Sequence, residues 1–241
     1  MAEKVKPYKN SNLGKKEQVT QMFDTISKEY DGLNRVISFG IDVKWRNNVV
    51  DIIAKTKPST VLDIATGTGD LAINLVKTNA KKIVGLDISP GMLEVGKAKV
   101  EKLKLNQIEM VLADSEKIPF EDNSFDAITV AFGVRNFEDL EKGLSEIYRV
   151  LKSGGTFVVL ETSVPTKTPF KQGYNIYTKH IMPTIGKVFS KDKVAYKYLS
   201  DSAASFPYGK AFNNILAKIG FIDIENKPQT FGVASIYIGK K

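Results

Sequence analysis

The sequence predicts an α/β protein with a mainly parallel sheet and helices on both faces. Apolar runs of strand length alternate with amphipathic helix patterns, and the connections between them are short. The last two runs alternate in hydrophobicity and follow each other directly, which predicts an antiparallel hairpin. Five parallel strands and this hairpin together predict a mixed seven-stranded sheet.

The individual elements follow from these patterns in chain order. A helix pattern runs from Glu17 to Tyr30, and the later helix before the hairpin ends at Gly220. The glycine pair at 154–155 is expected to close a helix and to begin the fifth strand. The final two strands are expected to join through Pro228. The five parallel strands are expected near residues 59–64, 82–87, 108–113, 126–132 and 155–162.

Two segments lie outside this alternating core. We expect residues 1–55 to form an N-terminal helical lid and residues 56–241 to form the main domain. Within that domain, residues 163–206 are an insertion rich in aromatic side chains, which we expect to cap the substrate. Both segments should lie near the carboxyl ends of the strands, where ligands bind in open α/β folds. The alternative is that they pack on the core as ordinary helices.

The composition limits the function. The 241 residues include no cysteine, which excludes disulfides, thiolate metal sites and a cysteine nucleophile. No signal-peptide pattern and no run of about 18 apolar residues is present, so a cytoplasmic protein is expected. The sole histidine, His180, has no acidic or serine partner at motif spacing and is interpreted as structural.

The chain is basic, with a formal net charge of +8. Its lysines are spread along the sequence and do not form one dense block. A solvated surface accounts for this charge, but nucleic acid phosphates or an anionic membrane surface could also use it. Composition alone leaves these alternatives open.

The turn that follows the first strand is the most specific motif. Gly67 to Ala72 fits the dinucleotide fingerprint, in which glycines let a ligand approach the backbone at a helix N-terminus. Asp63 and Asp70 flank the turn and would repel a pyrophosphate, at about 1 kcal/mol per close pair of charges. They would attract a cation. S-adenosylmethionine carries a sulfonium and an ammonium group, so we predict that this cofactor binds at the turn, against Asp63, Gly67 and Gly69.

The ends of the next two strands supply further cofactor contacts. Asp87 lies 18 positions after Gly69, close to the spacing of about 20 expected for an acid that holds two ribose hydroxyls. Helix capping does not require Asp87, because Ser89 already has the residue type of an N-cap. Asp114 and Ser115 end the third strand and could accept the adenine amino group, although as isolated residues they could equally be loop residues.

The fourth strand ends in the sequence AFGVRN, residues 131–136. Methyltransferases that act on amino groups of nucleic acids should have an Asn/Asp-Pro-Pro-aromatic turn here, so nucleic acid is not expected as the substrate. Arg135 would face the cofactor cleft, where a fixed guanidinium could stabilise an oxyanion. The alternative is a surface ion pair with Glu138 or Asp139.

Taken together, several motifs resemble the demethylmenaquinone and ubiquinone C-methyltransferase family. The similarity extends from about residue 17 to the C-terminus, and it rests on KEYDGLN, SFGIDVKWR, DIATGTGDLA, GLDISPGML, IPFEDNSFDAITVAFGVRN, RVLKSGG, YLSDSAASFP and FGVASIYIG. The resemblance implies the class I S-adenosylmethionine-dependent methyltransferase fold, which is Rossmann-like. It also implies cofactor contacts at Thr68, Asp87, Asp114 and Ser115, a prenylated quinol substrate and no metal.

The expected reaction is methyl transfer to a ring carbon of demethylmenaquinol, which gives menaquinol. Arg135 would favour the phenolate, while Tyr30 or Asn34 would hydrogen-bond a ring oxygen. The alternatives are a benzoquinol precursor of ubiquinone, another small-molecule or sterol-type C-methyltransferase, and a non-enzymatic RNA- or membrane-binding module. Because the prenyl tail lies in the bilayer, the basic lid could dock on anionic lipid, which would place a cytoplasmic protein peripherally at the inner face of the membrane.

Overall fold

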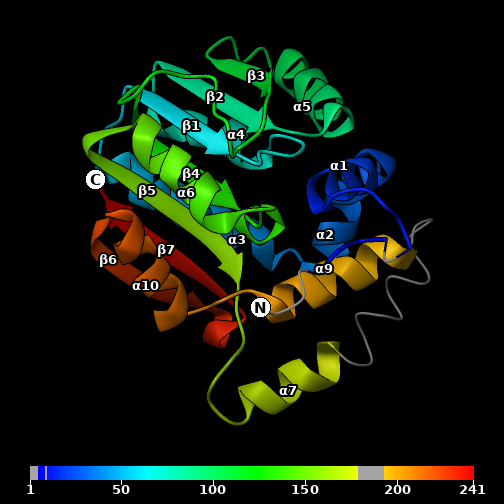
Figure 1. Cartoon of the computed structure of the whole chain (residues 1–241). Coiled ribbons are helices and arrows are strands. Elements are labelled where there is room, and N and C mark those ends of the chain that lie inside the picture. The colour runs from blue at the N-terminus through cyan, green and yellow to red at the C-terminus, as the bar shows by residue number, and fades with distance from the viewer. Residues whose placement is uncertain (1–4, 9, 179–192) are drawn as a thin grey trace.

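The computed structural model describes residues 5–8, 10–178 and 193–241, which form a seven-stranded sheet with helices around it (Figure 1). The strand order is β3-β2-β1-β4-β5-β7-β6. Strands β1 to β5 pair in parallel, and β7 runs antiparallel to both β5 and β6. The predicted mixed sheet with a C-terminal hairpin is therefore confirmed. The strands are β1 (Thr60–Ile64), β2 (Lys82–Asp87), β3 (Ile108–Leu112), β4 (Phe125–Ala131), β5 (Leu151–Thr162), β6 (Ile222–Gln229) and β7 (Ala234–Lys240).

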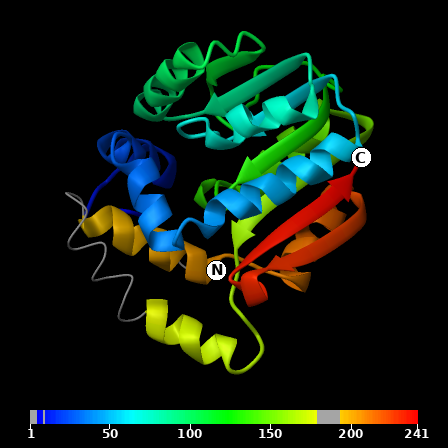
Figure 2. The ribbon, with the colours of Figure 1, turned by 180° about the vertical axis from the view of Figure 1, so that it is seen from behind.

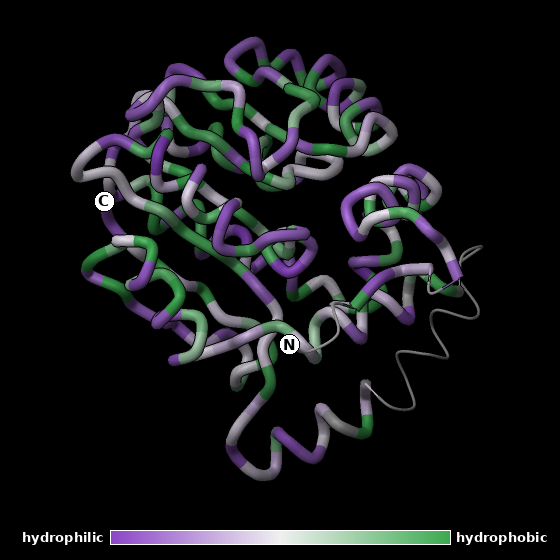
Figure 3. Tube along the Cα trace, in the orientation of Figure 1, coloured by the Kyte–Doolittle hydropathy of each residue, from purple (hydrophilic) through white to green (hydrophobic). Residues whose placement is uncertain are grey.

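Helices cover both faces of the sheet because its central strands are apolar on both sides. In β1, Val61 packs into one core and Leu62 into the other, as the alternation of side chains along a strand requires. Hydrophobic residues follow the central strands in Figure 3. One face carries α3 (Ile41–Lys55), α4 (Asp70–Asn74), η1 (Leu75–Thr78) and α5 (Pro90–Lys102), and the other carries α6 (Leu140–Val150) and α10 (Lys210–Ile219).

A third group of helices packs away from the sheet. The helices α1 (Lys15–Ile26), α2 (Tyr30–Ser38) and α9 (Lys193–Ser205) share a small core with the start of α5, and this core includes Met22, Leu33, Met92 and Tyr198. The short helix α7 (Phe170–Ile176) follows β5. The N-terminal and insertion segments therefore contact each other, whereas α3 lies along the sheet (Figure 2). Residues 179–192, which include His180, are outside the described part of the chain.

The helix expected from Glu17 to Tyr30 is α1, but it ends at Ile26, and α2 begins at Tyr30. The two helices make polar contacts with different loops of the sheet. Asp24 accepts hydrogen bonds at the start of α5, while Asp31 accepts one from the glycine turn after β1.

The glycine pair 154–155 does not close a helix, so this expectation was wrong. Helix α6 ends at Val150, and Leu151 is already extended. Gly154 has φ +76° inside β5, and its N–H donates to the Lys241 carbonyl at 2.8 Å. The pairing of β4 with β5 is irregular at this point, as expected where a strand carries extra residues.

The final hairpin does not turn at Pro228. This proline lies within β6 and pairs with Ser235, and the turn is the short helix η4 (Thr230–Gly232). Strand β6 is an edge strand of the sheet, where a residue without an N–H is tolerated. Among the described residues, no helix is long and apolar enough to span a membrane.

Candidate active site

The glycine turn after β1 is hydrogen-bonded to Asp87 at the end of β2. Gly67 and Gly69 have φ +59° and +81°, a region in which residues with side chains are strained. A Cβ on Gly69 would lie 2.5 Å from Cε of Met110. The Gly67 N–H donates to Oδ2 of Asp87 at 2.8 Å, and the Ser89 N–H donates to Oδ1 at 2.9 Å. Asp87 therefore ties the turn to the loop after β2.

Asp63 lies beneath this turn. Its Oδ1 accepts from the Thr129 hydroxyl at 2.7 Å, and its Oδ2 accepts from the Thr66 hydroxyl at 2.6 Å. Burial raises the pKa of Asp63 to about 6, although both hydroxyls oppose the rise. The carboxylate thus holds the turn from below and has no contact with the adjacent cavity.

A cavity of about 70 Å³ lies above the turn and the strand ends. Of the residues predicted to bind the cofactor, Gly67, Asp87, Asp114 and Ser115 line it. Thr68 and Gly69 do not: the Thr68 hydroxyl donates to Oδ1 of Asp31 at 2.5 Å and so attaches the turn to α2, and Gly69 lies at the start of α4. The other walls are mostly apolar and include Leu86, Ile88, Met92, Ala113 and Phe137.

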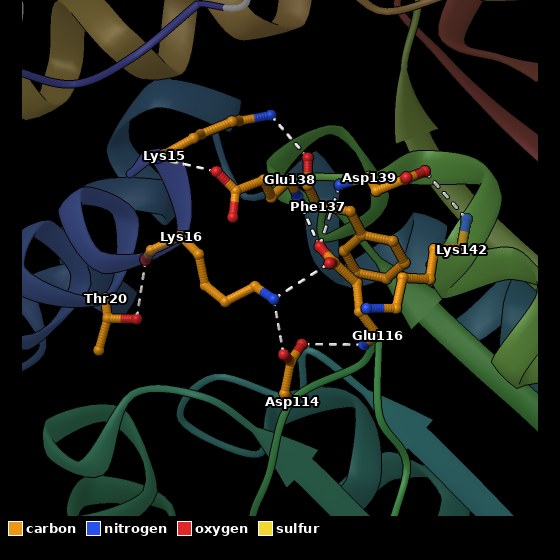
Figure 4. Close-up of polar contacts among 9 residues, drawn as sticks. All are labelled: Lys15, Lys16, Thr20, Asp114, Glu116, Phe137, Glu138, Asp139 and Lys142. Atoms are coloured by element: carbon orange, nitrogen blue, oxygen red, sulfur yellow. Dashed lines mark hydrogen bonds and ion pairs between the residues drawn. The ribbon is translucent and has the colours of Figure 1, made fainter. Parts of the chain in front are cut away.

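Helix α1 covers this cavity, and Lys16 extends across it (Figure 4). The Lys16 ammonium lies 2.7 Å from Oδ2 of Asp114 and 3.0 Å from Oε2 of Glu116. The neighbouring Lys15 ammonium donates to the carbonyls of Arg135 and Phe137 at 3.0 and 2.8 Å. Two lysines therefore attach the first turn of α1 to the loops that follow β3 and β4.

A second, larger cavity of about 400 Å³ adjoins the first. Tyr30 and Phe132 line both cavities. The three residues predicted to act on the substrate, Tyr30, Asn34 and Arg135, all line the second one. Residues from α2, α3, α7, α9 and the ends of β5 and β7 complete a mostly apolar wall, among them Trp45, Val164, Tyr174, Tyr177, Leu199 and Val233.

Arg135 is held in a fixed position at the wall of this cavity. One guanidinium nitrogen, Nη1, donates to the Phe132 carbonyl at 2.8 Å and to Oε1 of Glu161 at 2.6 Å. Burial disfavours its charged form, but the Glu161 carboxylate keeps the pKa of Arg135 above its usual value. Arg135 thus pairs with a buried acid at the end of β5 and not with Glu138 or Asp139.

Two buried atoms of this ion pair, Nε of Arg135 and Oε2 of Glu161, have no hydrogen-bond partner among the described residues. Buried polar groups are rarely left unpaired, and those that are often mark a site that binds another group.

Tyr30 is a partly buried side chain that the positive charge of Arg135 also affects. Burial raises the pKa of Tyr30, while its hydrogen bond to Asn34 and the charges of Arg135 and Arg46 oppose the rise.

Three residues of the site were missed at the sequence level. Arg46 forms an ion pair with Asp42, and both line the second cavity; the WR pair of residues 45–46 was the signal. Glu161 ends the apolar run of the fifth strand, which is a position where ligands bind in parallel sheets. Lys16 gave no signal, because its partners lie about a hundred positions away in the sequence.

Comparisons with known proteins agree with this geometry. Residues 11–241 match the model of the ubiE/COQ5 methyltransferase family. A demethylmenaquinone methyltransferase of Bacteroides fragilis is 47% identical, and the alignment covers 99% of this chain and 98% of the relative. The ubiquinone/menaquinone biosynthesis C-methyltransferase of Geobacter sulfurreducens is 44% identical, with 99% and 93% covered.

The solved structures show the same fold at lower identity. The crystal structure of an S-adenosyl-L-methionine-dependent methyltransferase from Methanococcus maripaludis has a TM-score of 0.61 and 23% identity, and the match covers 97% of this chain and 96% of that one. The class I methyltransferase fold is therefore confirmed.

Proposed function

Because this chain belongs to the ubiE/COQ5 methyltransferase family, we propose that it methylates a ring carbon of demethylmenaquinol with S-adenosylmethionine as the donor. The product is menaquinol. The observation that carries the proposal is the pair of adjoining cavities, one at the glycine turn and one rich in aromatic side chains, which share Tyr30 and Phe132.

The first cavity has the residues that S-adenosylmethionine needs. Gly67 has no side chain to block a ligand. The Asp87 carboxylate accepts backbone N–H groups of Gly67, Ile88 and Ser89, and its two oxygens have further lone pairs for ribose hydroxyls. The apolar residues Ile88 and Met92 offer faces for a planar base. Asp114 and Ser115 lie at the same wall and are proposed to contact the adenine. When bound, this cofactor supplies an electrophilic methyl group on a sulfonium centre.

The second cavity fits a quinol ring. A ring carbon becomes a good nucleophile when the neighbouring hydroxyl loses its proton, so the site must stabilise a phenolate. The Arg135 guanidinium remains charged at any relevant pH and is fixed by Phe132 and Glu161, so it can stabilise that oxyanion without reorganisation. Tyr30 and Asn34 line the same cavity and are proposed to hydrogen-bond a ring oxygen.

We propose that the helices over the site help to exclude water. The ring carbon gains a methyl group and one proton is released overall, while a cation and an anion combine into neutral products. A dry site favours such a reaction, because charge disappears as it proceeds. Helix α1 lines the first cavity and α2 lines both, which is consistent with this requirement.

The alternative acceptor is a demethylated benzoquinol precursor of ubiquinone. The Geobacter sulfurreducens relative is named for both quinones. The prenyl tail of either substrate lies in the bilayer, and we propose that this basic protein binds peripherally to an anionic membrane to reach it.

A methyl-transfer assay tests the proposal. The purified protein is incubated with methyl-labelled S-adenosylmethionine and membranes that contain both demethylated quinols, and the labelled lipid is identified by mass spectrometry. Label in menaquinone supports the leading proposal, and label in both quinones makes the enzyme dual-function. Label in neither, with cofactor binding intact, contradicts the acceptor assignment.

A further inference from the structure

Several large apolar side chains are exposed on one end of the molecule. Phe39 is 71% exposed, Phe231 68%, Ile176 60% and Phe170 39%. We call these four residues, three aromatic and one aliphatic, the aromatic rim. They come from the end of α2, from α7 and from the turn η4, which are far apart in the sequence. Exposed apolar groups that gather from separate elements are typical of a binding surface.

The rim is continuous with the second cavity. The Phe39 ring lies 6.0 Å from the ring of Tyr177, which lines the cavity and donates a hydrogen bond to the Ile37 carbonyl at 2.5 Å. On the other side, Phe170 and Phe231 stack with ring centroids 3.8 Å apart and join α7 to η4. A long apolar tail that leaves the cavity next to Tyr177 would meet this rim directly.

The segment of the rim that contains α7 carries charge of one sign. Residues 162–178 contain Lys167 and Lys171 and no acidic residue. Every residue from 166 to 173 is exposed, so both lysines and Phe170 reach the surface together. Lysines next to exposed aromatic side chains are the combination that binds anionic lipid headgroups and inserts into the layer beneath them.

We infer that the aromatic rim docks on an anionic lipid bilayer, with Phe39, Phe170, Ile176 and Phe231 in the interfacial layer and Lys167 and Lys171 at the phosphates. This orientation turns the second cavity toward the bilayer, and α5 points away from it because α5 lies at the opposite end of the molecule (Figure 1, Figure 2). The inference rests on the proposed function, since a prenylated acceptor gives the surface its purpose.

Vesicle co-sedimentation tests the surface without any substrate. The full-length protein is mixed with phosphatidylglycerol vesicles or with phosphatidylcholine vesicles at about 0.1 M salt, where charge attraction is only partly screened. We expect binding to phosphatidylglycerol that weakens at high salt. The double variant Phe170→Ser, Phe231→Ser should bind at least about tenfold more weakly, and Lys167→Gln with Lys171→Gln should lose about fivefold per lysine.

Matched variants control for general surface changes. Leu103 is 54% exposed at the end of α5, and Lys97 and Lys102 are exposed on α5. Leu103→Ser and the pair Lys97→Gln, Lys102→Gln should bind like the parent. The inference is overturned if the parent ignores phosphatidylglycerol vesicles, or if the α5 variants lose as much binding as the rim variants.

An assay with a soluble acceptor distinguishes failure of this inference from failure of the proposed function. The rim residues do not line either cavity, so the Phe170→Ser, Phe231→Ser variant should methylate a short-chain demethylmenaquinol as fast as the parent. It should be at least about tenfold slower on the acceptor in vesicles. If the parent binds vesicles but methylates neither acceptor, the docking surface stands and the proposed function fails.

Discussion

The two cavities are built in different ways. The first is formed largely by turns at the ends of neighbouring parallel strands, such as Gly67 after β1 and Asp87 at the end of β2. The second is formed largely by helices from both ends of the chain, α2 and α3 before the sheet and α7 and α9 after β5. The difference indicates that cofactor binding depends on local turn chemistry, whereas acceptor binding depends on long-range packing of helices. Each prediction below tests that division.

The largest effect is expected at Arg135, on the acceptor side. Arg135→Ala should lower turnover about 100- to 1000-fold, because a fixed charge near a developing oxyanion is lost. The dissociation constant of S-adenosylmethionine should change less than about twofold. Kinetics and calorimetry measure the two quantities. The control is Glu161→Gln, which removes only the ion-pair partner, and equal losses of turnover and cofactor affinity in Arg135→Ala would contradict the assignment.

The second prediction concerns Asp63, beneath the cofactor turn. Its pKa is raised from 3.8 to about 6, so the folded state binds more protons than the unfolded state between these values. Stability from this group is therefore present at low pH and is lost as pH rises to about 6, by about 3 kcal/mol in all.

Urea unfolding at pH about 4.5 and about 7 measures this effect. Relative to the parent, Asp63→Asn should gain stability at the higher pH and should show a smaller loss between the two values. A variant that follows the parent at both pH values would mean that Asp63 titrates normally.

The third prediction concerns Asp87, which lines the first cavity. Asp87→Asn places an amide N–H2 opposite the N–H of Gly67 or Ser89, where the carboxylate now accepts both. The affinity for S-adenosylmethionine should fall about 10- to 100-fold, since charged hydrogen bonds are lost. Turnover at saturating cofactor should stay near the parent value. A fall in turnover alone, with unchanged affinity, would place Asp87 on the acceptor side.

The smallest effect is expected from Gly69→Ala. The positive φ and the contact with Met110 should destabilise the fold by about 1 to 2 kcal/mol. Gly32→Ala is the matched control, because Gly32 lies in α2 with nothing within 4 Å of an added Cβ, and alanine favours a helix by up to about 1 kcal/mol. Chemical unfolding measures both, and similar changes in the two variants would contradict the role of the turn.

Part of the site was predictable because its signals are local. The strands lie within one or two residues of their expected positions except at the start of β5, and the Ser89 hydroxyl accepts from the Met92 N–H as an N-cap should. Pairing of neighbouring parallel strands then brings Gly67 and Asp87 together without further information. The irregular pairing of β5 around Gly154 was not predictable, because the Gly154 N–H donates to the carbonyl of Lys241, which is distant in the sequence.

The fold class, the glycine turn and the strand-end acids follow from local sequence signals, because the hydrophobic period and turn chemistry act over a few residues. Long-range packing places Asp63 under the turn, Thr68 against Asp31 and Lys16 across the first cavity. It also paired Arg135 with Glu161, although the sequence offered Glu138 and Asp139 closer by. These contacts join residues that are distant in the chain, and their partners are chosen by which side chains the packed helices and strands bring within reach.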